Sequence, residues 1–508
     1  MTASWSLENV DLVALDILAS RLALFLKPGD VVTLCGPLGA GKTTFARALI
    51  ARLGGESEVP SPTFALMQRY ETPRLVVTHC DFYRLEPSEL DELGLDDAAS
   101  EGAVLIEWPE RAPGWIPAER LDIAIDETAT PNARRIILTG HGSWQERLNR
   151  LRGMSAFLAG TTYASAPARY LQGDASTRSY ARLVLPDGSA ILMNSPRQPD
   201  GPPIRDGKPY SQLVHLAEDV TPFVAVAGAL RQCGLSAPAI YGFDLERGFL
   251  LLEDLGDRVF GAEIARGQSM AGLWEAAVEV LLALAQNRPQ ERLPIDGIGF
   301  YRLPVYDPEA MLIEASLLID WFWAALYGGQ APPDLAAEFE ALWRPLLAET
   351  AGADQGWVLR DYHSPNLMWL PEREGIKRVG ILDFQDALRG PLAYDLVSLL
   401  QDARLDVPEA LERDLLARYC ADRGAQSQHF SSETFLSLYA TLGAQRNSKI
   451  LGIFARLAKR DGKRGYLAHI PRVARYLERD LAHPALAGLR RFYAREFGDL
   501  RKLPAIAI

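Results

Sequence analysis

A glycine-rich segment at residues 36–43 constrains the fold of this chain more than any other feature. It reads Gly-Pro-Leu-Gly-Ala-Gly-Lys-Thr, the G-x-x-x-x-G-K-[ST] pattern of a phosphate-binding loop. The short apolar run 30–35 comes directly before it and predicts a buried strand, and 44–53 predicts a helix. A strand, a glycine loop and a helix in this order let backbone N–H groups and a helix N-terminus hold a phosphate.

Side chains in and after this loop are candidates for nucleotide chemistry. Lys42 would add a point charge to the phosphates, and the Thr43 hydroxyl is suited to bind Mg²⁺. Farther along, Ser-Pro-Thr-Phe at 61–64 is a loop in which Thr63 could sense a γ-phosphate. We therefore expect ATP and Mg²⁺ in this part of the chain.

Two further predicted strands end in a carboxylate. The run 75–81 ends in Asp81, and the run 102–107 ends in Glu107. One such acid alone would be read as a helix cap or a surface charge. Because ligands of doubly wound sheets bind at the carboxyl ends of the strands, two of them beside a phosphate loop favour a magnesium and nucleotide site.

The four cysteines, Cys35, Cys80, Cys233 and Cys420, lie far apart and form no C-x-x-C pair. This spacing argues against a disulfide framework or a cysteine zinc site and is typical of a reducing compartment. His79 beside Cys80 suggests a metal, but adjacent residues of a strand face opposite ways. We expect both to be structural.

The motifs GPLGAGKTT, SPTF, HCDFYRL and IEWPER, in this order, resemble the TsaE family over about residues 5–140. The resemblance implies a small ATPase of the bacterial machinery that places threonylcarbamoyl on adenosine 37 of tRNA. It implies that the domain acts with the other subunits of that complex and meets tRNA through them. Residues 1–140 hold 12 Lys or Arg against 21 Asp or Glu, a charge poorly suited to binding tRNA phosphates directly.

The same resemblance assigns roles to individual residues. Thr43 and Asp81 would attend Mg²⁺, and Glu107 would be a metal ligand or a catalytic acid that orients water. Thr63 would belong to a switch loop, and Trp108 to the active surface. The residues implied to bind the ATP triphosphate are Gly36, Leu38, Gly39, Ala40, Gly41, Lys42, Thr43 and Thr44.

A domain boundary is predicted where Gly-His-Gly at 140–142 interrupts the pattern. The apolar spacing that follows predicts a helix over 143–158, with Ser143 as its N-cap. We assign 1–142 to the first domain and 143–508, including this helix, to the second.

The second half has the element order of a kinase. A strand, an Asp-Gly turn and a strand at 180–194 predict a β-hairpin, and 173–178 lies where a phosphate-covering loop would be. We place a small β lobe at about 165–255 and a larger helical lobe at about 256–490. The expected fold class is α/β: a P-loop domain with a mainly parallel sheet, then a two-lobed, protein-kinase-like α+β domain.

Three polar residues of this half carry the expected chemistry. Asp361 is followed five residues later by Asn366, and a predicted strand ends in Asp383. In kinases this arrangement supplies an acid that accepts the substrate's hydroxyl proton and two ligands for Mg²⁺. The D-x4-N pattern is weak alone, and the strand-terminal Asp and the lobe order strengthen it.

The blocks LQGDASTRSY, GFLLLEDLG, LRDYHSPNLMW and ILDFQDALRGPLAYDL, with LGIFARLAKRDGKRGYL, resemble the aminoglycoside-phosphotransferase-like kinases over about 145–485. They are most similar to the AmgK branch, anomeric kinases of N-acetylmuramate and N-acetylglucosamine in cell-wall recycling. This implies ATP-dependent phosphorylation of an amino sugar at its C1 hydroxyl, with Asp361 as base and Asn366 and Asp383 on the metal.

Two residues depart from many kinase-like folds. Met193 stands where a phosphate-gripping Lys is common, which is a trait of the AmgK branch, and Leu359 stands where His often precedes the base by two residues. Phosphate binding would then fall to Ser176 and Arg178. Leu359 leaves open that this half is weakly active or inactive.

Two other clusters have competing interpretations. The basic residues between 446 and 464 favour a solvated face or partners for acidic helices, with Arg446 and Lys449 the best candidates to contact a sugar carboxylate, a phosphate or RNA. The cluster Trp321-Phe-Trp323 near Glu314 could floor a sugar site, and core packing is favoured.

Composition fits a globular protein. The chain has 508 residues, 48% hydrophobic and 23% charged, and a net charge of −12, which excludes a basic nucleic-acid coat. No signal peptide and no run of about 18 uncharged apolar residues is evident, so a cytoplasmic protein without a membrane partner is expected.

We thus predict a bifunctional fusion of an ATPase and a sugar kinase. Three alternatives stay open: a tRNA-modification ATPase with a non-catalytic nucleotide-binding scaffold, a sugar kinase with a regulatory ATPase, and an ATP-dependent assembly switch in which neither half turns over fast.

Overall fold

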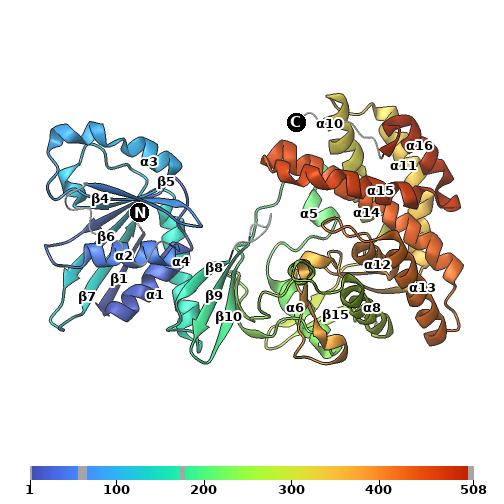
Figure 1. The fold of residues 1–508 in the computed structure, drawn as a ribbon, viewed down its shortest axis with the longest axis horizontal. Helices are drawn as coiled ribbons and strands as arrows, with labels where there is room; N and C mark the ends of the chain where they lie inside the picture. The colour runs from blue at the N-terminus through green and yellow to red at the C-terminus, as the bar shows by residue number, and fades with distance from the viewer. Residues whose placement is uncertain (1–2, 55–65, 172–177, 501–508) are drawn as a thin grey trace. The chain divides into compact units, whose positions relative to one another are not determined.

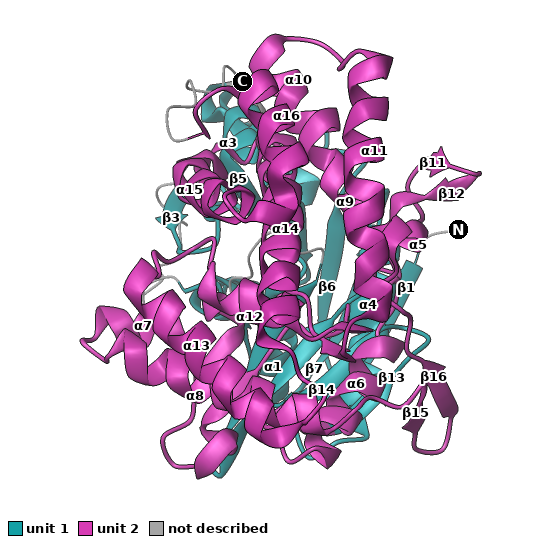
Figure 2. Cartoon of the chain, turned by 90° about the vertical axis from the view of Figure 1, so that its right-hand side faces the viewer, with its two compact units in different colours: residues 1–196, 241–254 teal, residues 197–240, 255–508 magenta. Residues whose placement is uncertain are grey.

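The computed structural model describes residues 3–54, 66–171 and 178–500. The chain forms two compact units. The first comprises 1–196 with 241–254, and the second comprises 197–240 with 255–508, shown in teal and magenta in Figure 2.

The first unit contains a seven-stranded mixed sheet in the order β1-β7-β6-β2-β5-β4-β3 (Figure 1). Its centre is parallel, with β2 between β5 and β6 and with β4 beside β5, and its edge pairings are antiparallel. The strands are β1 Ala3–Val10, β2 Val31–Cys35, β3 Met67–Glu71, β4 Val76–Asp81, β5 Gly102–Glu107, β6 Leu121–Glu127 and β7 Arg134–Gly140. The helices with it are α1 Leu12–Ala23, α2 Lys42–Arg52, α3 Leu95–Glu101 and α4 Trp144–Ala159. The predicted strands and helix around the glycine loop are confirmed.

Both faces of this sheet are buried at its centre, where every residue of β5 is buried. In β5, Ala103 and Leu105 join the core that contains α1, α2 and α4, while Val104 and Ile106 join a smaller core on the other face. This alternation is the two-residue period of a strand.

A second, five-stranded sheet follows in the same unit, in the order β13-β14-β10-β9-β8. Its strands are β8 Ala168–Leu171, β9 Ser179–Leu185, β10 Gly188–Asn194, β13 Ile240–Asp244 and β14 Phe249–Glu253. The predicted hairpin is confirmed, since Ala190 lies opposite Leu183 across β10 and β9.

Helix α4 lies between the two sheets and completes one core for both (Figure 1). Its buried residues Leu148, Leu151 and Leu158 belong to the same apolar cluster as Leu138 of β7 and Leu251 of β14. The assignment of this helix to a separate second domain stays a prediction, and core packing continues across the predicted boundary.

Polar contacts of α4 also reach both sheets. Arg147 forms a bidentate ion pair with Asp30, which directly precedes β2, at 2.7 Å. Three residues later Arg150 donates to the side chain of Asn194 at the end of β10, at 2.7 Å. Ser143 occupies the predicted N-cap position of α4, but its hydroxyl donates to Glu119 and makes no capping hydrogen bond.

The second unit is mainly helical, and α14 runs through its centre (Figure 2). Two glycines allow its neighbours to approach closely: a Cβ on Gly452 would lie 2.3 Å from the backbone of Leu317, and one on Gly443 would lie 2.6 Å from the Asp480 carboxylate. The main elements are α6 Thr221–Gln232, α8 Met270–Gln286, α9 Pro308–Leu317, α11 Pro333–Ala348, β17 Gln355–Val358, β18 Leu367–Trp369, β19 Val379–Ile381, β20 Leu388–Pro391, α12 Ala393–Leu400, α13 Glu409–Gln426, α14 Ser432–Asp461, α15 Ile470–Leu481 and α16 Ala487–Phe497.

One helical stretch of this unit, Pro308–Tyr327, has the length and apolar composition of a membrane span. It contains Glu309, Glu314 and Asp320, so it is not an uncharged apolar run, and the sequence analysis expected none of about 18 residues. About 67% of the stretch's most apolar window is buried inside the protein, as in the core helix of a soluble domain.

The shared core predicts that the two sheets of the first unit lose stability together. Leu151→Ala removes a fully buried side chain from α4 and should lower the free energy of unfolding by about 2–5 kcal/mol. Hydrogen exchange should become faster in both β2 and β10. The control is Val184→Ala on β9, where the side chain is 48% exposed. Faster exchange confined to one sheet would contradict a shared core.

Candidate active sites

The glycine loop of the first unit is built from residues with left-handed backbone. Gly36, Gly39 and Gly41 have φ values of 139°, 81° and 110°, which disfavour any residue with a Cβ. At Gly36 a Cβ would also lie 2.2 Å from the carbonyl oxygen of Ile125. The glycines predicted from the motif are therefore required by the geometry of the loop.

Lys42 begins α2 and turns back into the loop. Its ammonium donates to the carbonyl oxygens of Gly36 at 2.7 Å and Pro37 at 2.9 Å, and lies 3.6 Å from the ring centroid of Trp108. Burial lowers the pKa of Lys42, and the nearby carboxylate of Glu107 opposes that shift. This places the charge inside the loop that would receive the phosphates and puts Trp108 at the predicted active surface.

The expected magnesium residues converge at the same edge of the sheet. The Thr43 hydroxyl donates to Glu107 Oε2 at 2.9 Å, and Asp81 lies opposite Glu107 in the parallel pair β4–β5. Both acids are at least 95% buried. A hydroxyl and two carboxylates are oxygen donors of the kind that Mg²⁺ prefers, so these residues fit the ion.

His79 has a role that the sequence analysis missed. Its Nε2 lies 2.9 Å from Glu107 Oε1, and its ring is fully buried. Cys80 lies in the core on the other face, as predicted. The missed signal was the two-residue spacing from His79 to Asp81, which puts both on the face of β4 that carries the site.

The structure does not test three of the predicted nucleotide contacts, those of Thr63, Ser176 and Arg178. Thr63 and Ser176 lie outside the described residues. Arg178 directly precedes β9, and its contact with a phosphate stays a prediction.

The position of Thr43 predicts a specific magnesium defect. Thr43→Val keeps the shape of the side chain but removes the hydroxyl that faces Glu107. We expect magnesium-dependent binding of a fluorescent ATP analogue to weaken about tenfold. Thr130→Val, an exposed change in the turn between β6 and β7, is the control. An unchanged magnesium dependence in Thr43→Val would remove this residue from the metal site.

In the second unit, the predicted base lies on a short loop between β17 and β18. The N–H of Asp361 donates to Leu359 O at 2.8 Å, and the side-chain amide of Asn366 donates to Asp361 O at 2.9 Å. Arg360 between them has a φ of 69°, a conformation that non-glycine residues seldom adopt. These hydrogen bonds thus fix the backbone conformation of the loop that carries Asp361.

Two buried acids of the following segment accept hydrogen bonds from the backbone of this loop. Asp395 of α12 accepts from the backbone N–H groups of Leu359 at 2.6 Å and Arg360 at 3.0 Å. Asp402 accepts from the N–H of Ser364 at 2.8 Å. Neither acid was predicted as a site residue, because neither belongs to the D-x4-N pattern.

The two acids are shifted in opposite directions. Burial, with a smaller effect of the Asp361 charge, raises the pKa of Asp395 to about 7. Burial acts the same way on Asp402, but the nearby His363 ring, whose Nδ1 lies 3.9 Å from Asp402 Oδ1, and hydrogen bonds from the N–H groups of Ser364 and Arg404 outweigh it and lower the pKa of Asp402 to about 2. Asp402 is therefore an anion at neutral pH, whereas Asp395, with a pKa of about 7, titrates there.

Asn366 and Asp383 are brought together by the β18–β19 hairpin, in which Leu367 lies opposite Ile381. The N–H of Leu382 donates to Asn366 O at 2.9 Å, and Gln385 donates to Asp383 Oδ1 at 3.0 Å. An amide oxygen and a carboxylate at this position are suitable ligands for Mg²⁺.

The structure shows the surroundings of Met193 and Leu359, the two residues that depart from common kinase patterns. Met193 is 1% exposed and packs inside the small sheet, and α6, all of which is described, contains no acidic residue. Met193 therefore cannot supply the cation of the Lys–Glu pair of protein kinases, and α6 supplies no carboxylate for it. Leu359 is buried and donates its backbone N–H to Asp395, which any residue except proline could do.

Lys449 belongs to a buried ion-pair cluster. The structure therefore does not support the interpretation that Lys449 contacts a sugar carboxylate, a phosphate or RNA. Its ammonium lies 2.8 Å from Glu314, which also faces Arg360 at 3.4 Å. Both cations lower the pKa of Glu314 against the effect of burial. Arg446 is likewise buried, and Phe322 packs in the core against Phe497, as favoured for the aromatic cluster.

Asp395 predicts a pH dependence of stability. Between pH 3.8 and about 7, the folded chain keeps a proton on Asp395 that the unfolded chain has lost, so stability should fall by a few kcal/mol as pH rises through this window. Asp402 acts below the window, where its stabilisation is lost as pH falls from 3.8 toward 2. Urea unfolding from pH 4 to 7 should show a steeper decline in wild type than in Asp395→Asn. Equal slopes would contradict the assignment.

Comparison with known proteins gives two families. The model of the threonylcarbamoyl adenosine biosynthesis protein TsaE matches residues 11–136, and that of the phosphotransferase enzyme family matches 167–428. An N-acetylmuramate/N-acetylglucosamine kinase of Caulobacter vibrioides is 39% identical over 67% of this chain and 95% of its own length.

The first part has relatives of its own. Proteins named tRNA threonylcarbamoyladenosine biosynthesis protein TsaE from Rickettsia bellii and Bacillus subtilis are 44% and 42% identical, covering 21% and 26% of this chain and 74% and 82% of their own lengths. The predicted fusion is confirmed: the chain belongs to the TsaE family in its N-terminal part and to the phosphotransferase enzyme family in its C-terminal part.

Proposed function

We propose that this chain is a bifunctional enzyme with two separate ATP sites. The observation that supports the proposal is that two groups of residues suited to phosphate chemistry lie on two different folds. One set is the glycine loop with Thr43, Asp81 and Glu107, and the other is the loop of Asp361 with Asn366 and Asp383.

The C-terminal part is proposed to phosphorylate N-acetylmuramate or N-acetylglucosamine at the anomeric hydroxyl. Asp361 would accept the hydroxyl proton while the sugar oxygen attacks the γ-phosphorus and the bond to the ADP oxygen breaks. Asn366 and Asp383 would hold magnesium, which neutralises charge on the phosphates. Support comes from the kinase relative, which matches over 95% of its own length.

The N-terminal part is proposed to be the ATPase subunit of the threonylcarbamoyl-transfer machinery. Lys42 and the loop glycines would hold the triphosphate, and Thr43 and Asp81 would hold magnesium with Glu107 as ligand or water-orienting acid. Its excess of acidic residues supports contact with tRNA through the other subunits of the complex. Both activities use soluble substrates, and we place the protein in the cytoplasm.

Transfer of labelled γ-phosphate to the two sugars tests the kinase proposal. Wild type and Asp361→Asn are compared in a Lys42→Ala background, which silences the first site. We expect transfer to fall at least about 100-fold with Asp361→Asn and to persist with Asp334→Asn, an exposed change on α11. Absence of transfer to both sugars in the parent would overturn the proposed substrate class.

A further inference from the structure

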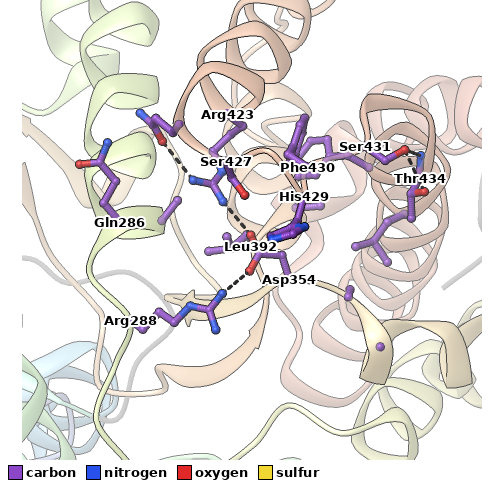
Figure 3. Close-up of a pocket in the computed structure, with 17 residues that line it drawn as sticks. Gln286, Arg288, Asp354, Leu392, Arg423, Ser427, His429, Phe430, Ser431 and Thr434 are labelled. Atoms are coloured by element: carbon purple, nitrogen blue, oxygen red, sulfur yellow. Dashed lines mark hydrogen bonds and ion pairs between the residues drawn. The ribbon is translucent and has the colours of Figure 1, made fainter.

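A cavity of about 760 Å³ lies in the second unit, and Asp361, Asn366 and Asp383 do not line it. It is bounded by the end of α8, the turn before β17, the start of α12 and the connection between α13 and α14 (Figure 3). Its volume is that of a site for a small molecule.

The charge in this cavity is unbalanced. Asp354 accepts from Arg288 at 3.0 Å and from Arg423 at 2.7 Å, and both guanidinium groups point toward it in Figure 3. One carboxylate neutralises one of these two cations. Arg288 is 74% exposed in its side chain, so it can exchange its bond to Asp354 for one to a ligand at little cost in packing.

The remaining lining is suited to the body of a polar organic molecule. Phe430 gives an aromatic surface that packs against Phe435, with the Arg423 guanidinium 5.8 Å from the Phe430 ring centroid. Ser427 and His429 add hydrogen-bonding groups at the same wall. The Ser431 hydroxyl already accepts from the N–H of Thr434. The groups that can attract an anionic ligand are therefore the guanidinium groups of Arg288 and Arg423.

Two walls of the cavity continue into the elements that hold the catalytic loop. Asp354 directly precedes β17, which leads to Asp361 seven residues later. Leu392, whose N–H donates to Asp354 O at 3.2 Å, directly precedes α12, which carries Asp395. Asp395 in turn binds the N–H groups of Leu359 and Arg360.

We propose that this cavity is a second ligand site, for a small organic phosphate, and that its occupancy is transmitted to the catalytic loop through β17 and α12. Arginine side chains bind phosphate oxygens through paired, charge-assisted hydrogen bonds, and the aromatic wall receives the organic part. The ligand is either a sugar phosphate or a nucleotide. The binding claim is independent of the proposed reaction, whereas its regulatory meaning rests on the proposed kinase activity.

Calorimetric titration of the full chain with N-acetylglucosamine 1-phosphate and, separately, with ADP tests this site. Arg288→Glu is compared with Arg302→Glu, a matched control on β16 Gly299–Arg302 whose side chain is 77% exposed and paired with Glu291 at 2.9 Å. We expect one binding event to weaken at least about tenfold in Arg288→Glu alone. The ligand that loses this event identifies the source of the phosphate. Unchanged binding of both ligands in Arg288→Glu overturns the site.

Hydrogen exchange tests the transmission without an activity assay. The ligand should slow exchange across residues 354–361 and 392–400 in wild type and in Arg302→Glu, and this slowing should be lost in Arg288→Glu. Ligand binding without slower exchange in these segments overturns the coupling. Because neither readout requires sugar phosphorylation, failure of the proposed reaction and failure of this site are distinguishable.

Discussion

The apolar face of α4 is the constraint on which the first unit depends. Its leucines complete a core that reaches from the parallel centre of the large sheet to the small sheet of the kinase. Arg147 of this helix forms an ion pair with Asp30, which precedes β2 and the glycine loop. Arg150 donates a hydrogen bond to Asn194 at the end of β10. Removing the helix would expose apolar side chains of both sheets to water, and both families therefore contribute strands to one compact unit.

The kinase chemistry depends in the same way on groups that do not touch substrate. The loop that carries Asp361 contains a strained residue, Arg360, and is kept in place by Asp395, Asp402 and the buried pair of Arg360 with Glu314. A buried charge is tolerated only where partners compensate for lost hydration. These partners explain how Asp361 keeps its geometry although Leu359 replaces the common histidine.

Local patterns predicted much of this arrangement. The glycine loop, the strand-end acids Asp81 and Glu107, and the β9–β10 hairpin follow from short-range spacing, since each is encoded within a few residues. The contact between His79 and Glu107 was not predicted, because the two residues are 28 positions apart in the sequence. The sequence could not predict the roles of Asp395, Asp402 and the Glu314–Lys449 pair for the same reason, because only tertiary packing brings these residues to their partners. The continuous core around α4 was also hidden, because a helix with one apolar stripe does not show which sheet it covers.

The central claim is that one chain with a shared core carries two chemically separate ATP sites. The most direct test measures tRNA threonylcarbamoyladenosine content and sugar phosphorylation side by side in strains whose only copy carries Lys42→Ala or Asp361→Asn. The account predicts that Lys42→Ala abolishes the tRNA modification alone and that Asp361→Asn abolishes sugar phosphorylation alone. Loss of both activities with either substitution, in a chain that remains folded, would contradict it.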